Sequence, residues 1–307
     1  MIPDRLRVEV QQINQKVSEN VYKLVSRGEN AYIEQVKDAA SEIKAKNCRI
    51  VLITGPSGAG KTTTSYKLKQ ELENLSTKVY VINMDDFFKD LIDVPLREDG
   101  EPDIEGICAL DVECVKTCLN DLLTKLKTKI PSYDFETNKR KQEWRDVKLN
   151  GDEIVIMEGI HALNPQIYNG LDLDKIYKIY VHCNTDFVVE NTVVLEAREL
   201  RLLRRIVRDE RTRHISLAET LEMWTHVNEG EEKNIRPFKE EADFFLNSTH
   251  FYEPHLYKSL LLNRFEDIDD EHSMIKKLLV KFKLFSFVDE RFVPENSLLR
   301  EFIGEKK

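Results

Sequence analysis

The sequence has few cysteines, no long apolar run and no excess of basic residues. Its longest apolar runs, around Val51 and Ile154, span a few residues, far fewer than the roughly 20 that a membrane span needs. Residues 1–5 are charged and lack the apolar core of a secretory signal. The cysteines are odd in number and lack the CxxC spacing of metal sites, so we expect reduced thiols in a cytoplasmic protein. They are Cys48, Cys108, Cys114, Cys118 and Cys183.

The charge balance is acidic. The chain has 46 lysines and arginines against 55 aspartates and glutamates, a formal net charge of -9. This charge argues against broad binding to nucleic acid or to an anionic membrane surface. We therefore expect a small-molecule partner, neither nucleic acid nor membrane, and any site for an anion must be local.

Residues 55–62 read GPSGAGKT, the GxxxxGKT pattern of a phosphate-binding loop. An apolar run precedes the pattern and a helical stretch follows it, which is the context that a functional loop requires. Backbone N–H groups of such a loop cradle phosphates, while Lys61 reaches the β- and γ-phosphates and the Thr62 hydroxyl holds Mg²⁺. The pattern predicts binding of a nucleoside triphosphate. The predicted contacts are Gly55, Ser57, Gly58, Ala59, Gly60, Lys61, Thr62 and Thr63.

Apolar segments alternate with helical patterns along the rest of the chain. Strands are predicted at 49–54, 79–84, 153–158, 176–182 and 242–247. Helices are predicted at 61–74, 110–127 and 186–208. This alternation indicates a doubly wound α/β fold with a mostly parallel five-stranded sheet. Ligands of such sheets bind at the carboxyl ends of the strands.

The N-terminal part is predicted to be helical. Apolar residues recur at intervals of three or four over 4–26 and again over about 30–46. We predict a helical extension, 1–46, followed by one catalytic domain, 47–307. The first helix would either pair with a second copy as a coiled coil, giving a homo-oligomer, or pack onto its own domain, and packing is favoured.

Carboxylates follow the second and third predicted strands. Asp85 is predicted to face the phosphate loop, where it would bind Mg²⁺ or accept a proton from an attacking hydroxyl. Glu158 is predicted to belong to the metal shell. The alternatives are a helix cap, a role that we leave to Asp86, and an ordinary carboxylate at a strand end.

A row of arginines supplies the local positive charge. Arg201, Arg204, Arg205 and Arg208 share one helix face and would repel one another unless an anion lies among them, and we predict polyphosphate. The segment 216–219 has the sequence of a capping box. Residues 209–215 are therefore predicted to form a loop that carries Arg211 and Arg213 within a lid of about 201–227. A solvated charged face is the alternative.

In combination these segments resemble the uridine kinase branch of the phosphate-loop kinases, in the phosphoribulokinase/uridine kinase family, and are most similar to bacterial-type nucleoside kinases. The resemblance rests on order and approximate spacing. Its segments are the phosphate loop, 84–88, 133–135, 158–160, 204–209, 230–235, 247–248 and 296–304.

The resemblance implies phosphorylation of the 5′-hydroxyl of a nucleoside, uridine or cytidine, with ATP and Mg²⁺ as cofactors. The implied catalytic residues are Asp85, Lys61 and Arg208. The implied metal ligands are Thr62, Asp85 and Glu158. Arg205, Arg208, Arg211 and Arg213 would contact phosphates or close the lid. The implied substrate contacts are Asp85, Tyr133, Phe135, Asn138, Arg140, Glu158 and Arg205.

Two departures from the family pattern concern the acceptor. Cys108 stands near the place of an aspartate that grips the ribose hydroxyls, and Asn138 replaces a histidine beside the pyrimidine. A kinase of another small alcohol, like phosphoribulokinase or pantothenate kinase, is therefore an alternative, and so is a nucleotide-binding regulatory protein. The sequence has no NKxD guanine-reading motif, which argues against a GTPase.

Overall fold

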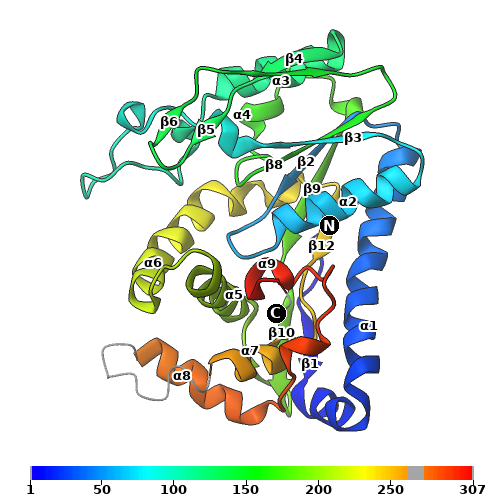
Figure 1. The fold of residues 1–307 in the computed structure, drawn as a ribbon, viewed down its shortest axis with the longest axis vertical. Helices are drawn as coiled ribbons and strands as arrows, with labels where there is room; N and C mark the ends of the chain where they lie inside the picture. The colour runs from blue at the N-terminus through cyan, green and yellow to red at the C-terminus, as the bar shows by residue number, and fades with distance from the viewer. Residues whose placement is uncertain (1, 262–272, 306–307) are drawn as a thin grey trace.

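A central sheet of five parallel strands carries helices on both faces in the computed structural model, which describes residues 2–261 and 273–305 (Figure 1). The strand order is β12-β9-β2-β8-β3. The strands are β2 (Ile50–Thr54), β3 (Val79–Asn83), β8 (Ile154–Glu158), β9 (Ile176–His182) and β12 (Phe244–Asn247). All five lie where the sequence predicts them, and the predicted doubly wound α/β fold is confirmed.

The side chains of β2 alternate between two hydrophobic cores. Val51 and Ile53 face the core that contains α1 (Val10–Ala45) and α2 (Lys61–Asn74). Ile50 and Leu52 face α3 (Val112–Thr124) and α4 (Pro165–Tyr168) on the other side of the sheet. Figure 1 shows α3 and α4 together at the top, with α1 and α2 on the other side of the central strands. Because β2 is buried on both faces, it is a continuous apolar run without polar alternation.

The prediction of a helix at 186–208 is wrong for the first half of this range. Residues there form a hairpin of β10 (Thr185–Val189) and β11 (Thr192–Leu195), and α5 (Ala197–Thr212) begins only afterwards. The hairpin segments are rich in β-branched residues, which favour strands. Glu190 and Asn191 both have positive φ, as the tight turn of a hairpin requires. The helices predicted at 61–74 and 110–127 are confirmed as α2 and α3.

The N-terminal helix also begins later than predicted. Residues Leu6–Glu9 form β1, which pairs with β10, so the prediction of helix from residue 4 is wrong. From Val10 to Ala45 the chain is helical except at Asn20, whose side chain accepts a hydrogen bond from the Lys23 N–H and so caps the second part of α1. The helix packs into the core of the central sheet. A division into 1–46 and 47–307 stays a prediction, and its second range includes residues 262–272 and 306–307, which lie outside the described residues.

The remaining elements surround the sheet. The small antiparallel ladders join β4 (Lys127–Ile130) to β7 (Arg145–Lys148), and β5 (Tyr133–Asp134) to β6 (Lys139–Arg140). The later helices are α6 (Leu217–Asn234), α7 (Glu253–Leu261), α8 (Ser273–Lys281) and α9 (Arg300–Ile303). In the part of the chain that the structure describes, every helix is too short or too polar to cross a membrane.

A buried ion pair joins α5 to α7. The Arg204 guanidinium donates to both carboxylate oxygens of Glu253, at 2.5 and 2.8 Å, and both side chains are 0% exposed. Glu253 also accepts from the Tyr257 hydroxyl, while Arg204 donates to the Ser248 hydroxyl. The charges are therefore paired and hydrogen-bonded on both sides, the condition under which buried ions are tolerated.

We predict that Arg204→Met lowers the free energy of unfolding by about 3–5 kcal/mol, because it leaves Glu253 buried without a counter-charge. Chemical denaturation measures the change. Arg198→Met on the same helix is the control, since its pair with Glu232 is exposed and should contribute less than about 1 kcal/mol. Equal effects of the two substitutions would contradict the assignment.

Candidate active site

The predicted site residues gather in a cavity at the carboxyl ends of β2, β8 and β3. The three strands are adjacent, and Glu158 at the end of β8 lies opposite Ile53 on one side and Asn83 on the other. The cavity has a volume of about 890 Å³. It is the edge of the sheet at which ligands of doubly wound folds bind.

The phosphate loop connects β2 to α2 across this edge. Gly60 has a φ of 85°, a conformation that side chains rarely adopt, and a Cβ there would lie 2.8 Å from Leu298. A Cβ on Gly55 would lie 2.1 Å from the Val181 carbonyl oxygen. Both positions therefore require glycine. Gly60 has no side chain with which to cap α2, so the first N–H groups of this helix, which have no partner within it, can attract an anion.

Arginines of α5 hold the loop from outside. Arg201 and Arg204 donate to the carbonyl oxygens of Ser57 and Gly58, each at 3.0 Å. The anions beside these two arginines are protein carboxylates, because Arg201 pairs with Glu231 as Arg204 pairs with Glu253. The prediction that polyphosphate compensates the whole arginine row is thus wrong for these two residues, which shape the loop.

Three other arginines line the cavity. Arg205, Arg208 and Arg213 all contact the buried carboxylate of Asp209, at 3.1, 2.9 and 3.7 Å. Three cations share one carboxylate, so positive charge remains available to an anionic ligand. Arg205 also donates to the Ser57 hydroxyl at 3.1 Å.

The predicted loop at 209–215 is shorter in the structure. Helix α5 continues to Thr212, and the predicted capping box of Ser216 and Glu219 opens α6. Arg211 consequently lies on a helix, where it pairs with Glu290 and donates to the Ile303 carbonyl oxygen, each at 2.6 Å. It points away from the cavity that Arg213 lines.

Carboxylates also line the cavity. The Thr62 hydroxyl donates to Glu158 at 3.0 Å, and both residues line the cavity with Lys61 and Asp85. Burial raises the pKa of Asp85, against the effect of Lys61, and burial likewise raises the pKa of Glu158. A metal cation would relieve both carboxylates. One hydroxyl and two carboxylates suit Mg²⁺, which takes oxygen ligands and completes its shell with water and substrate phosphates.

A short 3-10 turn, Met84–Phe87, positions Asp85 directly after β3. The Asn83 side chain caps this turn by accepting from the Asp85 N–H at 2.9 Å. The capping role that the sequence left to Asp86 therefore belongs to Asn83. Asp86 instead pairs with Arg145 at 2.8 Å.

An aromatic cluster lines another part of the cavity. The ring centroids of Tyr133 and Phe135 are 5.0 Å apart, and Phe88 lies 5.6 Å from Tyr133. Asn138 lines the cavity beside them. Arg140 does not point into it: its guanidinium binds Asp111 and the Phe87 and Phe88 carbonyl oxygens, so it anchors the β5–β6 hairpin.

Glu105 lines the cavity, although the sequence reasoning missed it. Burial raises the pKa of this carboxyl against the opposing effects of Arg205 and Lys61. Cys108, which the sequence placed near the expected acid, instead contacts Asp103 at 3.8 Å. The signal was present, because an acid stands three residues before Cys108, but sequence alone did not show which residue of this turn faces the cavity.

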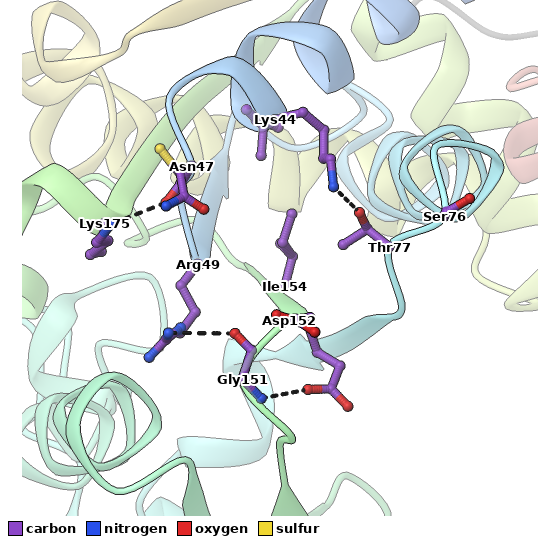
Figure 2. Close-up of a pocket in the computed structure, with 12 residues that line it drawn as sticks. Lys44, Asn47, Arg49, Ser76, Thr77, Gly151, Asp152, Ile154 and Lys175 are labelled. Atoms are coloured by element: carbon purple, nitrogen blue, oxygen red, sulfur yellow. Dashed lines mark hydrogen bonds between the residues drawn. The ribbon is translucent and has the colours of Figure 1, made fainter.

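A second pocket, of about 310 Å³, lies at the opposite end of the sheet (Figure 2). It is lined by residues before β2, β3 and β8. Its basic side chains already have partners: Lys44 binds Thr77 at 2.5 Å, and Arg49 binds the Gly151 carbonyl oxygen at 3.5 Å. Because ligands of such sheets bind at the carboxyl ends, the cavity beside the phosphate loop is the candidate active site.

The model of the Phosphoribulokinase / Uridine kinase family matches residues 50–251. A uridine kinase of Halobacterium salinarum is 30% identical over 196 residues, which cover 63% of this chain and 77% of that protein. One from Staphylococcus haemolyticus is 29% identical over 202 residues, 65% of this chain and 87% of that protein. The solved structure of a possible uridine kinase from Bacillus stearothermophilus gives a TM-score of 0.43 at 20% identity, covering 65% of this chain and 89% of that one.

We predict that Glu105→Gln stabilises the ligand-free protein at neutral pH and not at about pH 4. The pKa of Glu105 is raised in the folded state, so its charge opposes folding once the pH exceeds the unfolded value of about 4.3. Below that value the carboxyl is mostly protonated in both the folded and the unfolded state, so the substitution should change the free energy of unfolding little. Unfolding free energies across this pH range test the prediction. Glu98→Gln, exposed in the same segment, should change stability little at any pH.

Proposed function

The chain belongs to the phosphoribulokinase/uridine kinase family, and from this premise we propose that it transfers the γ-phosphoryl group of Mg²⁺-ATP to the 5′-hydroxyl of uridine or cytidine. Family membership makes the chain a phosphotransferase of the kinase type. One observation supports the nucleoside acceptor: a carboxylate, Glu105, and an aromatic cluster share a cavity with the phosphate loop.

The donor phosphates would lie against the phosphate loop and the start of α2. Lys61 would contact the β- and γ-phosphates, and Arg205, Arg208 and Arg213 would neutralise the charge that remains. Thr62, Glu158 and Asp85 supply the oxygen atoms that would hold Mg²⁺. When bound, the metal neutralises phosphate charge during transfer.

Asp85 would act as the base. As the acceptor oxygen forms its bond to the γ-phosphorus, the bond to the β-phosphate oxygen breaks, ADP leaves, and the hydroxyl proton passes to the Asp85 carboxylate. In the metal-free protein burial raises the pKa of this carboxyl, which favours its acceptance of a proton. Lys61 and Arg208 would neutralise charge on the transferring group.

The acceptor would lie along the remaining cavity wall. The Glu105 carboxylate can accept hydrogen bonds from ribose hydroxyls. Tyr133, Phe135 and Phe88 line the cavity with aromatic rings on which a base could stack. The Asn138 amide has both a donor and an acceptor, which suits the mixed edge of a pyrimidine. Phe135 is 62% exposed, and we expect a bound base to cover it.

The acceptor assignment is tested by ADP release from Mg²⁺-ATP, with each common nucleoside, pantothenate and ribulose 5-phosphate offered separately. We expect stimulation by uridine or cytidine. Stimulation by pantothenate or ribulose 5-phosphate alone would instead assign the chain to another alcohol. ATP binding without stimulation by any acceptor would favour the regulatory alternative.

We predict that Asp85→Asn lowers kcat by about 10²- to 10⁴-fold, the usual contribution of a general base. Because Thr62 and Glu158 would still hold the metal, the dissociation constant for ATP should change far less than kcat. Asp86→Asn is the matched control: this neighbouring carboxylate pairs with Arg145, and its loss should leave kcat close to that of the native protein. Unchanged turnover in Asp85→Asn would remove Asp85 from the mechanism.

A further inference from the structure

Glu301 reaches the phosphate loop from the far end of the chain. It belongs to α9 and lines the same cavity as Lys61 and Thr62. One oxygen of its carboxylate accepts hydrogen bonds from the N–H of Thr63, at 3.2 Å, and from the Thr63 hydroxyl, at 2.5 Å. Neither the phosphate-loop pattern nor the family match, which ends at residue 251, includes Glu301.

Thr63 lies in the first turn of α2, where N–H groups have no partner within the helix. These N–H groups and the positive end of the helix dipole attract any anion, a carboxylate as well as a phosphate. An N–H and a hydroxyl each have a single hydrogen to donate. A donor phosphate and Glu301 therefore cannot both bind Thr63 at full strength.

The backbone that carries Glu301 is fixed, whereas its side chain has room to leave. Leu298, Leu299 and Phe302 are buried in the main core, and Arg211 binds the Ile303 carbonyl oxygen. The Glu301 side chain, in contrast, is half-buried at the cavity wall. Rotation about its own bonds can withdraw the carboxylate from Thr63 while α9 stays packed on α5.

We propose that Glu301 is an internal competitor of the donor nucleotide: its carboxylate occupies the Thr63 donors in the ligand-free protein, weakens ATP binding, and leaves when a phosphate takes its place. The inference rests on the proposed function only in taking ATP as the donor. It gives Glu301, a residue outside the phosphate loop, control of the affinity for the donor nucleotide.

Calorimetric titration of the full chain with Mg²⁺-ATP tests the proposal. Glu301→Gln keeps the shape of the side chain and removes its charge, so we expect the dissociation constant for ATP to fall by about tenfold, as for loss of a charged hydrogen bond. Glu295→Gln, an exposed residue of the same C-terminal segment, should bind ATP like the native protein. Unchanged or weaker binding by Glu301→Gln would overturn the proposal.

Inorganic tripolyphosphate separates competition for phosphate from contacts with adenosine. We expect Glu301→Gln to tighten tripolyphosphate binding as well, and an effect confined to ATP would contradict competition at Thr63. Thermal unfolding excludes a purely structural role. The variant should melt below the native protein without ligand and not with saturating ATP, whereas an equal loss in both states would overturn the proposal.

A milder variant covers the case in which Glu301→Gln does not fold. Glu301→Asp is shorter by one methylene and should bind Thr63 less well, so it is also expected to bind ATP more tightly. No acceptor is present in these titrations. Tighter ATP binding by the variants therefore supports the competition even if no nucleoside is phosphorylated. If uridine is phosphorylated but the variants bind ATP like the native protein, the competition is wrong and the proposed function still stands.

Discussion

The N–H groups at the start of α2, which have no partner within the helix, are the feature on which the site depends. They can bind phosphate only if the preceding loop stays open, and a loop with so few side chains cannot hold that shape by itself. Arg201 and Arg204 supply the support by binding its carbonyl oxygens from α5. Both arginines in turn require buried carboxylates from other helices, Glu231 and Glu253. The shape of the phosphate loop thus depends on two ion pairs, Arg201–Glu231 and Arg204–Glu253, that lie outside the loop.

The cavity concentrates charges of both signs without pairing them fully. Arg205, Arg208 and Arg213 share Asp209, while the pKa values of Asp85, Glu105 and Glu158 are all raised by burial. Such an arrangement is costly in the ligand-free protein, and phosphates beside the arginines and a cation beside the carboxylates would relieve it. The same imbalance that would favour Mg²⁺-nucleotide therefore opposes stability, the usual exchange between stability and activity at catalytic sites.

The parts that the sequence predicted well are those determined by neighbouring residues. The phosphate loop, the five strands and the Ser216 capping box each follow from a short pattern, and the order of strands and helices implied the position of Asp85 and Glu158 at one edge. The errors arise where distant residues decide. In the sequence the row of arginines resembles a single anion site, but in the structure Glu231 and Glu253 from other helices pair with two of these arginines. Leu6–Glu9 becomes a strand because β10 lies beside it. Glu301 lies in the segment 296–304, which carries part of the family resemblance, but nothing in that segment indicates that its carboxylate contacts Thr63.

The contact between Thr63 and Glu301 joins residues 238 positions apart, and this separation has a consequence during synthesis. The ribosome makes the phosphate loop well before it makes the residues that support and cover the loop, Glu253, Leu298 and Glu301. Chains fold from the N-terminus as they emerge, at about 5–20 residues per second. The nascent chain therefore carries an incompletely supported phosphate loop for many seconds, and the site is complete only when α9 has docked.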